Sequence, residues 1–381
     1  MADSAADLAV RAALDRATDA IRRQIQDGRE PQYYTEAQPV EEVLKSHPVF
    51  YDTSSRFFAG KQLLLGPQWQ RGNLLKVATE HDSERALKWL YKVYSSQEAD
   101  IRYVAEVYGL TTERRITLSN GVTLHSFEEL PTSRNSRLLA EQLHAAHVPP
   151  FRPYELPIVA ALEVPGVKAT RTGKNYRSAT LEHSVMAFTL AEDTTPVVGQ
   201  SWIDFVDSDL RCAGIGLVGV GSRFEGPVPQ IAQEIDARAV EWVEKYLHLH
   251  AEVKHICDVA LERLNLGRRR RSPGNRAIEG AICLEALLGD KDTGDLTYKL
   301  TLRGALLLEH DLAKRRQVKK ALGEFYALRS RAVHGKAMTE DDPKLHSCAD
   351  QGLELCHRAL KKIVEQNKMP EPAEWELSGG A

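Results

Sequence analysis

Apolar and charged residues alternate with a helical period over much of the first third of the chain. In residues 5–26 the apolar positions fall between charged ones at helical spacing, at Leu8, Ala12, Leu14 and Ile21. A stronger stripe with a period of about 3.6 residues covers residues 82–110 through Leu87, Leu90, Tyr91, Tyr94, Tyr103, Val104 and Val107. Asp82 or Ser83 can cap the start of this second helix, and Gly109 can end it. Residues 1–110 are therefore predicted to form a mainly helical region.

The apolar period changes to two in the middle of the chain. Residues 116–118 and 122–124 flank Asn120-Gly121, a pair that readily takes the positive φ angles of a type I′ turn, and so predict a hairpin. Further strands are predicted at residues 157–163, 184–190, 197–206 and 214–220. Residues 111–228 are therefore expected to be an α+β region of unknown function.

From Pro229 onward the spacing is helical again. A long helix is predicted over residues 231–261, and the segment 267–275, with Gly, Pro and four arginines, is predicted to break it. Three helical stretches follow, at residues 276–288, 296–320 and 343–366, and the second can run on through residues 325–335. Residues 229–370 are thus expected to form a bundle of four or five helices, with a tail at 371–381. The whole chain is predicted to be α+β, with a mixed N-terminal region and an all-α C-terminal domain.

Composition and charge narrow the class of protein. The 381 residues favour two or three domains, and 43% hydrophobic with 27% charged residues is ordinary for a globular protein. A net charge of −3 argues against a protein that coats nucleic acid with its whole surface, so any such contact needs a local patch. Five scattered cysteines without a C-x-x-C pair, and no apolar stretch near about 18 residues, favour a cytoplasmic protein without a membrane partner.

Two further motifs have ordinary structural explanations. Residues 214–219 match G-x-G-x-x-G, but the residues after them lack a helical pattern, so a strand punctuated by glycines is favoured over dinucleotide binding. His248, His250, Glu252 and His255 lie close together on the predicted long helix, and metal ligation is geometrically open to them. No cysteine or second carboxylate cluster nearby completes such a site, so surface histidines are favoured, and no metal or cofactor is predicted.

The most informative segment is FYALRSRAVHG, residues 325–335. The Arg–His spacing alone says little, because three other segments also place a histidine shortly after an arginine: residues 137–144, 177–183 and 303–310. This segment differs because it lies at the end of a predicted helix that Gly335 can terminate. Arg329 is suited to hold a phosphate, His334 to act as general acid or base, and Ser330, four residues before His334, to orient its ring.

The run Tyr326-x-x-Arg329-Ser330-x-x-Val333-His334-Gly335 resembles the motif of Apea-like HEPN domains. Residues 282–288 and 302–307 resemble the helices that precede the motif in that family. The resemblance covers residues 268–366 and leaves the N-terminal region without a recognised family. Ser330 departs from the Asn, Asp or His that commonly follows the motif arginine, and is a weaker polar partner.

The resemblance implies a homodimer in which two motifs face each other and form one metal-independent RNase site. The RNA 2′-OH would attack the neighbouring phosphorus and leave a cyclic phosphate. On an ideal helix, positions five apart are rotated by about 140°, so Arg329 and His334 converge only at a helix end or across two protomers. The implied function is that of an endoribonuclease toxin or effector in bacterial antiviral defence or stress response, with the N-terminal region sensing or regulating.

The same resemblance suggests partners. RNA would be contacted by a basic set of residues: Arg268, Arg269, Arg270, Arg271 and Arg331. An antitoxin or another defence protein is an expected partner, and a nucleotidyltransferase could modify Tyr326. The alternative function is a non-catalytic HEPN dimer used for assembly or RNA binding. In that case Arg329 pairs with a carboxylate such as Glu285 or Glu324, His334 caps the helix, and the arginine run is a solvated loop or binds an acidic segment.

Overall fold

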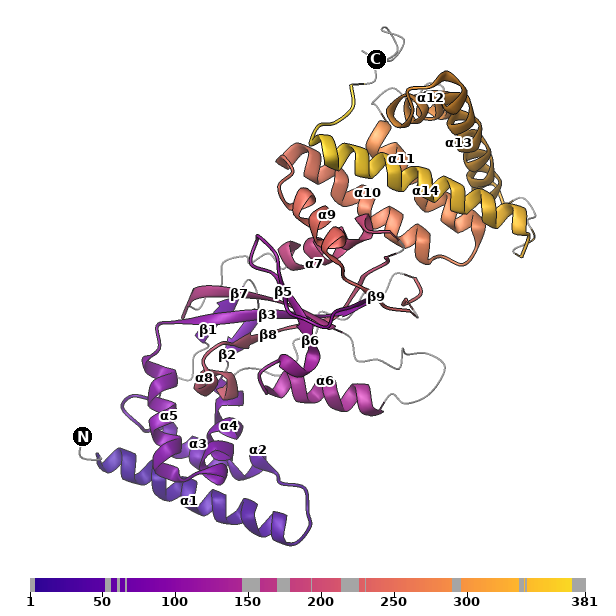
Figure 1. Cartoon of the computed structure of the whole chain (residues 1–381). Coiled ribbons are helices and arrows are strands. Elements are labelled where there is room, and N and C mark those ends of the chain that lie inside the picture. Colours follow the sequence, from indigo (N-terminus) through magenta and orange to yellow (C-terminus); the bar gives the residue numbers. More distant parts are fainter. Residues whose placement is uncertain are drawn as a thin grey trace.

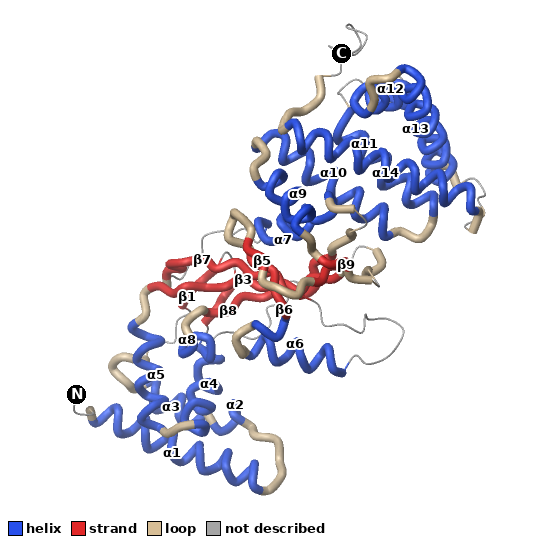
Figure 2. Tube along the Cα trace, viewed as in Figure 1, coloured by secondary structure: helices blue, strands red, loops and turns tan. Residues whose placement is uncertain are grey.

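The computed structural model describes residues 4–51, 56–59, 62–65, 67–145, 158–169, 179–192, 194–213, 226–229, 231–289, 296–335, 339 and 341–371. The protein is α+β, as predicted: an N-terminal group of helices, a central antiparallel sheet and a C-terminal helical bundle follow one another in space (Figure 1). The strands gather between the two helical regions, which lie at opposite ends of the molecule (Figure 2).

The N-terminal helices are α1 (Ala5–Gln26), α2 (Tyr33–Glu36), α3 (Gln38–Lys45), α4 (Pro67–Glu80) and α5 (Ser83–Ser95), with a short hairpin of β1 (Arg56–Ala59) and β2 (Gln62–Leu65). The predicted helix over residues 5–26 is confirmed. Ser4 and Asp7 cap its start reciprocally, each accepting the other's backbone N–H. The Asp7 carboxylate also accepts the Tyr91 hydroxyl at 2.8 Å, which links α1 to α5.

The second predicted helix, over residues 82–110, is wrong in its C-terminal half. Asp82 caps α5 as predicted and accepts the Arg85 N–H at 2.7 Å, but α5 ends at Ser95 and strand β3 (Glu98–Tyr108) follows. β3 is a central strand. Its first half alternates, with Ala99 and Ile101 buried between exposed Glu98 and Asp100, and its second half is buried on both faces, so the apolar residues are nearly continuous there. Gly109, at φ +81°, follows the strand and not a helix.

The sheet has the strand order β5-β6-β7-β3-β8, and all its pairs are antiparallel. Its other strands are β5 (Ile116–Thr117), β6 (Thr123–Ser126), β7 (Ile158–Lys168) and β8 (Val197–Phe205). The strands predicted at residues 157–163 and 197–206 are therefore confirmed. A separate parallel pair joins β4 (Leu110–Thr111) to β9 (Gln233–Glu234).

The hairpin predicted at residues 116–124 is present, but its turn differs from type I′. Gly121 alone has a positive φ, +86°, and its N–H donates to the Leu118 carbonyl at 2.9 Å. The Leu118 N–H in turn donates to the Val122 carbonyl at 2.8 Å. The loop is therefore the three-residue kind that ends in a left-handed glycine.

The predicted strand over residues 184–190 is wrong. Helix α7 (Ala179–Met186) and the 3-10 helix η2 (Ala187–Leu190) occupy it, and its residues are almost completely enclosed between the sheet and the bundle. A short apolar run does not distinguish a buried strand from a buried helix, which explains the error. The strand predicted at residues 214–220, and the glycine motif in it, lie outside the described residues.

Helix α6 (Arg134–Ala145) lies beside the sheet, after the 3-10 helix η1 (Phe127–Glu129). A small second core accompanies it, formed by Val104, Leu139, Val159, Ala161 and Trp202. The main core is continuous from the N-terminal helices through the other face of the sheet into the bundle. The three layers are therefore joined by buried apolar contacts.

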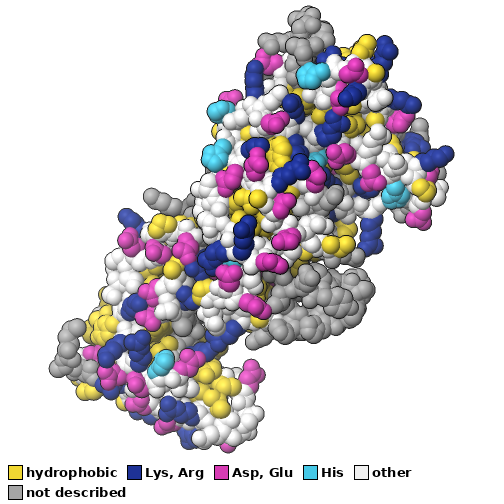
Figure 3. All heavy atoms as spheres, in the orientation of Figure 1, with side chains coloured by type: hydrophobic (Ala, Val, Ile, Leu, Met, Phe, Trp, Pro, Cys, Tyr) yellow, Lys and Arg dark blue, Asp and Glu magenta, His cyan; other side chains and the backbone are white. Residues whose placement is uncertain are grey.

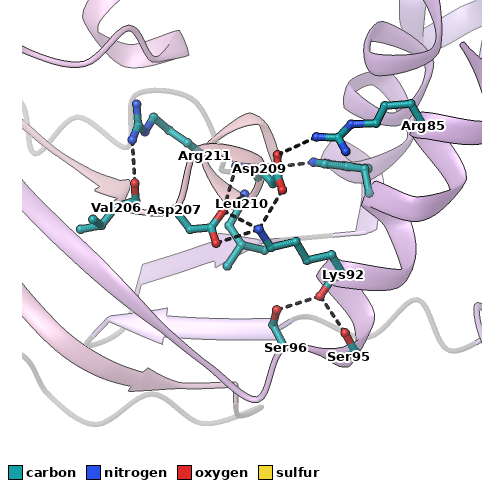
Figure 4. Close-up of polar contacts among 10 residues, drawn as sticks. Arg85, Lys92, Ser95, Ser96, Val206, Asp207, Asp209, Leu210 and Arg211 are labelled. Atoms are coloured by element: carbon teal, nitrogen blue, oxygen red, sulfur yellow. Dashed lines mark hydrogen bonds and ion pairs between the residues drawn. The ribbon is translucent and has the colours of Figure 1, made fainter. Parts of the chain in front are cut away.

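Helix α8 (Ser208–Ala213) joins the N-terminal helices to the end of β8 (Figure 4). Lys92 of α5 donates to Asp209 at 2.7 Å and to Asp207 at 3.0 Å. Trp89 donates its indole N–H to the Asp209 carbonyl at 2.7 Å. These bonds fix α5 against the sheet, in addition to the apolar contacts of the core.

The C-terminal region comprises α9 (Ala237–Leu247), α10 (Ala251–Arg269), α11 (Pro273–Leu288), α12 (Leu296–Leu308), α13 (Leu312–Val333) and α14 (Pro343–Gln366). Helix α14 has the predicted bounds. The single helix predicted over residues 231–261 is instead divided between α9 and α10, because Asn367 from the end of α14 binds the connection. Its side chain accepts the His250 N–H at 2.9 Å and donates to the His248 carbonyl at 3.5 Å.

Two more predicted boundaries moved. The break expected over residues 267–275 is shorter, since α10 continues to Arg269 and Pro273 begins α11. Gly267 lies inside α10 and does not end it. Its missing side chain leaves room for α14, because a Cβ would lie 2.9 Å from the Leu353 side chain. The stretch predicted as one helix over 296–320 is divided between α12 and α13, where Asp311 caps α13 by accepting the Lys314 N–H at 3.0 Å.

Glycine contacts inside the bundle generate a first prediction. A Cβ at Gly352 of α14 would lie 2.0 Å from the Phe325 ring, whereas a Cβ at Gly323 of α13 would meet nothing within 4 Å. Gly352→Ala should lower the free energy of unfolding by about 1–3 kcal/mol through overpacking. Gly323→Ala, the matched control, should raise it by up to about 1 kcal/mol through helix propensity. Urea unfolding followed by far-UV circular dichroism measures both, and equal effects would contradict the packing described.

A second prediction concerns His357 of α14, which donates to the Leu190 carbonyl of η2 at 2.9 Å. Burial, and then the nearby Arg268, lower the pKa of His357 from 6.5 to about 3. Between pH 6.5 and pH 3 this histidine is protonated in the unfolded chain but neutral in the folded chain. The buried neutral histidine therefore contributes to the free energy of unfolding above pH 6.5, and this contribution is lost as the pH falls toward 3.

His357→Gln keeps a donor but cannot titrate. The advantage of the wild type over this variant in free energy of unfolding should therefore shrink between pH 7.5 and pH 5. Exposed His255 provides the control variant, His255→Gln. Denaturant titrations at several pH values test this, and a difference independent of pH would refute it.

Candidate functional site

The motif occupies the last part of helix α13, where its first residues are buried in the bundle and its last residues are exposed. Its inner face is buried through Leu322, Phe325, Tyr326 and Leu328. The helix ends at Val333, and the His334 N–H donates to the Ser330 carbonyl at 3.1 Å. Gly335 follows with φ +62° and donates to the Ala332 carbonyl at 3.2 Å. The helix end at Gly335 was predicted and is confirmed.

Arg329 is half-buried between α13 and α11. Its Nη2 lies 3.9 Å from Oε1 of Glu285, which is an ion-pair contact but longer than a hydrogen bond. Its Nε is shielded from solvent and has no hydrogen-bond partner in the described part of the chain. Glu324, the other expected carboxylate, instead lies 3.9 Å from Lys320. The Arg329 guanidinium therefore lies near the Glu285 carboxylate without a hydrogen bond to it.

Ser330 and His334 are both exposed at the end of α13. Within the described residues, no hydrogen bond or ion pair links the side chains of Arg329, Ser330 and His334. Val333 beside them is 52% exposed, an unusual position for a valine at a helix end. A single chain therefore presents these residues on the surface without joining them into an enclosed site.

Tyr326 belongs to the core. Its hydroxyl donates to the Ala281 carbonyl of α11 at 3.3 Å, and burial raises its pKa well above the ordinary value. A modifying enzyme would reach this hydroxyl only in a locally opened form. Covalent modification at Tyr326 therefore has no support from its surroundings.

Most of the arginine run binds the protein's own chain. Arg268 donates to the carbonyls of Thr189 at 3.1 Å and Thr194 at 3.4 Å. Arg269 donates to Asn265 at 2.8 Å and to the Pro227 carbonyl at 3.0 Å, and Arg270 reaches Glu279 at 3.4 Å. Arg271 is exposed, and Arg331 is half-exposed on α13. Of the expected RNA contacts, Arg271 and Arg331 reach solvent, and neither forms a hydrogen bond or ion pair within the described part of the chain.

The histidine cluster is divided by the break between α9 and α10. His248 follows the end of α9 and His250 precedes the start of α10, so the helical spacing assumed for His248 and Glu252 does not hold. Among the described residues, no three His, Cys, Asp or Glu side chains lie close enough to share a metal ion. The described cysteine side chains, Cys257, Cys283, Cys348 and Cys356, are free thiols.

Three polar residues of the sheet were not predicted from the sequence: Glu106 and His125, which are buried, and Asp204, which is partly buried. Glu106 of β3 accepts the Gln200 N–H at 2.7 Å, and a Cβ at Gly199 would lie 2.5 Å from its carboxylate, so a glycine is needed there. His125 of β6 shares a row with Glu106, and burial lowers its pKa. Burial also raises the pKa of the Asp204 carboxyl, which accepts the Trp202 indole N–H at 2.9 Å. A polar residue inside an otherwise apolar strand could have marked each of these positions from the sequence. The hydrogen bonds of Glu106 and Asp204 account for their place in the sheet without a catalytic role.

The surface is electrically mixed. On the face drawn in Figure 3, lysine and arginine side chains are interspersed with aspartate and glutamate over all three layers. None of the described helices combines the length and apolar content needed to span a bilayer. Comparison of the chain with protein-family models, curated proteins and solved structures found no match.

The arginine contacts generate a third prediction. Arg268→Ala should lower the free energy of unfolding by about 1.5–3 kcal/mol, because two buried carbonyls lose a charged donor. Arg271→Ala, in the same run but exposed, should leave stability unchanged within about 0.5 kcal/mol. Urea denaturation of the two variants tests this assignment. Equal stability of Arg268→Ala and the wild type would show that the arginine does not hold the fold.

Proposed function

We propose that the protein is a metal-independent endoribonuclease of the HEPN type, with its reactive residues at the end of α13. The proposal rests on the motif and on one observation: the Arg329 side chain is 38% exposed and makes only a 3.9 Å contact with Glu285, beside a surface that carries exposed Ser330 and His334. An arginine with spare donors next to an exposed imidazole suits an RNA phosphodiester.

The proposed chemistry uses these side chains as follows. Arg329 holds the scissile phosphate and stabilises the charge that develops on its equatorial oxygens. The RNA 2′-oxygen attacks phosphorus, the bond to the 5′-oxygen breaks, and one proton moves from the 2′-OH to the leaving oxygen with His334 as acid or base. The products are a cyclic phosphate and a 5′-hydroxyl. Ser330, one helical turn before His334, orients the imidazole in this scheme.

A homodimer forms part of the proposal. Within the described chain no hydrogen bond or ion pair links Arg329 to His334, and positions five apart on an ideal helix are rotated by about 140°, so the proposal brings the two side chains to one phosphate from two protomers. A second copy of the helix end would supply the missing partner, and exposed Val333 gives that contact an apolar element. Arg331 and Arg271 would contact the RNA backbone outside the reacting phosphate.

In this proposal the protein acts in the cytoplasm as a toxin or effector of bacterial antiviral defence or stress response. The N-terminal helices would sense the trigger or restrain the nuclease. They lie at the far end of the molecule from the bundle (Figure 1), so such a signal would pass through the sheet. An antitoxin or another defence protein would bind this N-terminal part.

The second candidate function is a non-catalytic HEPN dimer for assembly or RNA binding. Two observations favour it: Arg329 lies beside Glu285 at 3.9 Å, and His334 follows the helix end as a cap residue. The observed positions of Arg329 and His334 are also those expected of a structural ion pair and a helix-capping residue. This function differs from the first because it requires no strand scission.

The fourth prediction separates the two functions. Purified protein incubated with mixed RNAs in EDTA should cleave them and leave cyclic phosphate ends, resolved by sequencing gels and mass spectrometry. His334→Ala should reduce the rate by about 100-fold or more, the contribution typical of a general acid or base. His255→Ala, which removes an exposed histidine of α10, should cleave at the wild-type rate. RNA binding without scission by the wild type would favour the assembly function.

A mixing experiment tests whether the site is composite. Arg329→Ala and His334→Ala should each be inactive alone. If Arg329 of one protomer works with His334 of the other, a mixed dimer of the two variants has one such pairing that carries both mutations and one that carries neither. Activity restored on mixing therefore requires pairing across protomers. Arg316→Ala, an exposed arginine on the same helix, should remain active. Full activity of Arg329→Ala would contradict the role given to this residue.

A further inference from the structure

A polar groove lies at the other end of the bundle from the motif. It is formed by α9, α14, the end of α12 and Glu192, which follows η2, and its volume is about 670 Å³. His310 in the groove precedes the start of α13, whereas the motif lies at the end of that 22-residue helix. A helix of this length spans roughly 33 Å, so the groove and the proposed nuclease residues are separate sites.

Two cations converge in the groove. Arg238 Nη2 of α9 lies 3.2 Å from Oε1 of Glu192, and Lys361 Nζ of α14 lies 4.0 Å from the same oxygen. Lys361 also lies 4.3 Å from the centroid of the Trp242 ring. Side chains from two helices therefore surround one negatively charged atom.

Positive charge exceeds negative charge along the described lining. Five arginine or lysine side chains and three glutamates line it. Two of the cations already have partners, since Arg358 lies 2.6 Å from Glu309, outside this set, and Lys362 lies 3.5 Å from Glu365. Burial lowers the pKa of Lys361. Arg238 and Arg268 lower it further, while Glu192 and Glu354 oppose the shift. The pKa of His357, at the inner wall, is lowered to about 3 by burial and by Arg268 and Lys361. An added anion would relieve this repulsion among neighbouring cations.

We propose that the groove binds a multiply charged phosphate group, such as a diphosphate, with Arg238 and Lys361 as its principal ligands. The Glu192 carboxylate occupies the place that a phosphate oxygen would take. Its side chain is 64% exposed, so it can move into solvent when the ligand binds. A singly charged carboxylate ligand would gain little over Glu192, whereas a diphosphate brings more charge and more acceptors for the arginine fork. The site goes beyond the proposed nuclease function and does not depend on it.

Isothermal titration calorimetry of the full chain with inorganic pyrophosphate tests the proposal. We expect saturable binding of one pyrophosphate per chain. Lys361→Met should weaken it by about tenfold or more, as loss of a charged contact does. Glu192→Gln should tighten it, because the competing carboxylate is gone. Lys320→Met, an exposed lysine of α13, should bind like the wild type.

Parallel titrations identify the source of the phosphate. Adenosine diphosphate that binds more tightly than pyrophosphate would support the site and assign it to a nucleotide, while adenosine alone should not bind. Absence of pyrophosphate binding, or equal binding by Lys361→Met, would overturn the proposal, as would binding of an oligoribonucleotide alone. If Lys361→Met does not fold by circular dichroism, Arg238→Met, at a position that is 66% exposed, replaces it with the same expected weakening.

Discussion

The fold depends on how the buried carbonyl groups around η2 are satisfied. This short 3-10 helix is enclosed between the sheet and the bundle, where water cannot pair with its last carbonyls. Arg268 donates to Thr189, and His357 donates to Leu190. Asn265 donates to the Thr189 hydroxyl and to the Pro196 carbonyl, both at 3.0 Å. Each orphaned group would cost about 1–3 kcal/mol, so the bundle and the sheet stabilise one another at this junction.

This constraint changes the meaning of the arginine run. As a sequence, four consecutive arginines suggest a basic patch for a phosphate backbone. In the structure three of them are bound to the protein's own carbonyl, amide and carboxylate groups, because α10 extends through Arg269 and directs them toward η2 and α11. Arg238 and Lys361, which do not belong to the run, come together around Glu192 where α9 meets α14.

Strand β8 connects the two junctions that hold the layers together. It begins just after Pro196, whose carbonyl Asn265 binds, and it ends just before Asp207, which pairs with Lys92 of α5. In between it pairs with the central strand β3. Strand β8 is thus flanked by bonds to the N-terminal helices at one end and to the bundle at the other, while the proposed nuclease residues lie at the C-terminal end of α13 and the polar groove lies near its N-terminal end.

The sequence by itself determined the features that depend on neighbouring residues. The periods of α1 and α14, the cap at Asp82, the hairpin around Gly121 and the helix end at Gly335 follow from preferences that act over a few positions. For the candidate site, this was sufficient to place the motif at a helix end. It did not show that Tyr326 faces the core, or that Glu285 and not Glu324 lies beside Arg329.

Tertiary structure decided the rest, because the deciding partners are distant in the chain. Burial on both faces removed the alternating pattern from the second half of β3, which is a strand where the sequence predicted the continuation of a helix. Asn367 divided α9 from α10 from 117 residues away, and His357 reaches Leu190 across 167 residues. The pattern of neighbouring residues does not indicate such long-range contacts. The segment from Tyr326 to Gly335 was correctly located as a helix end by sequence, but its surroundings were set by the packing of α11, α13 and α14.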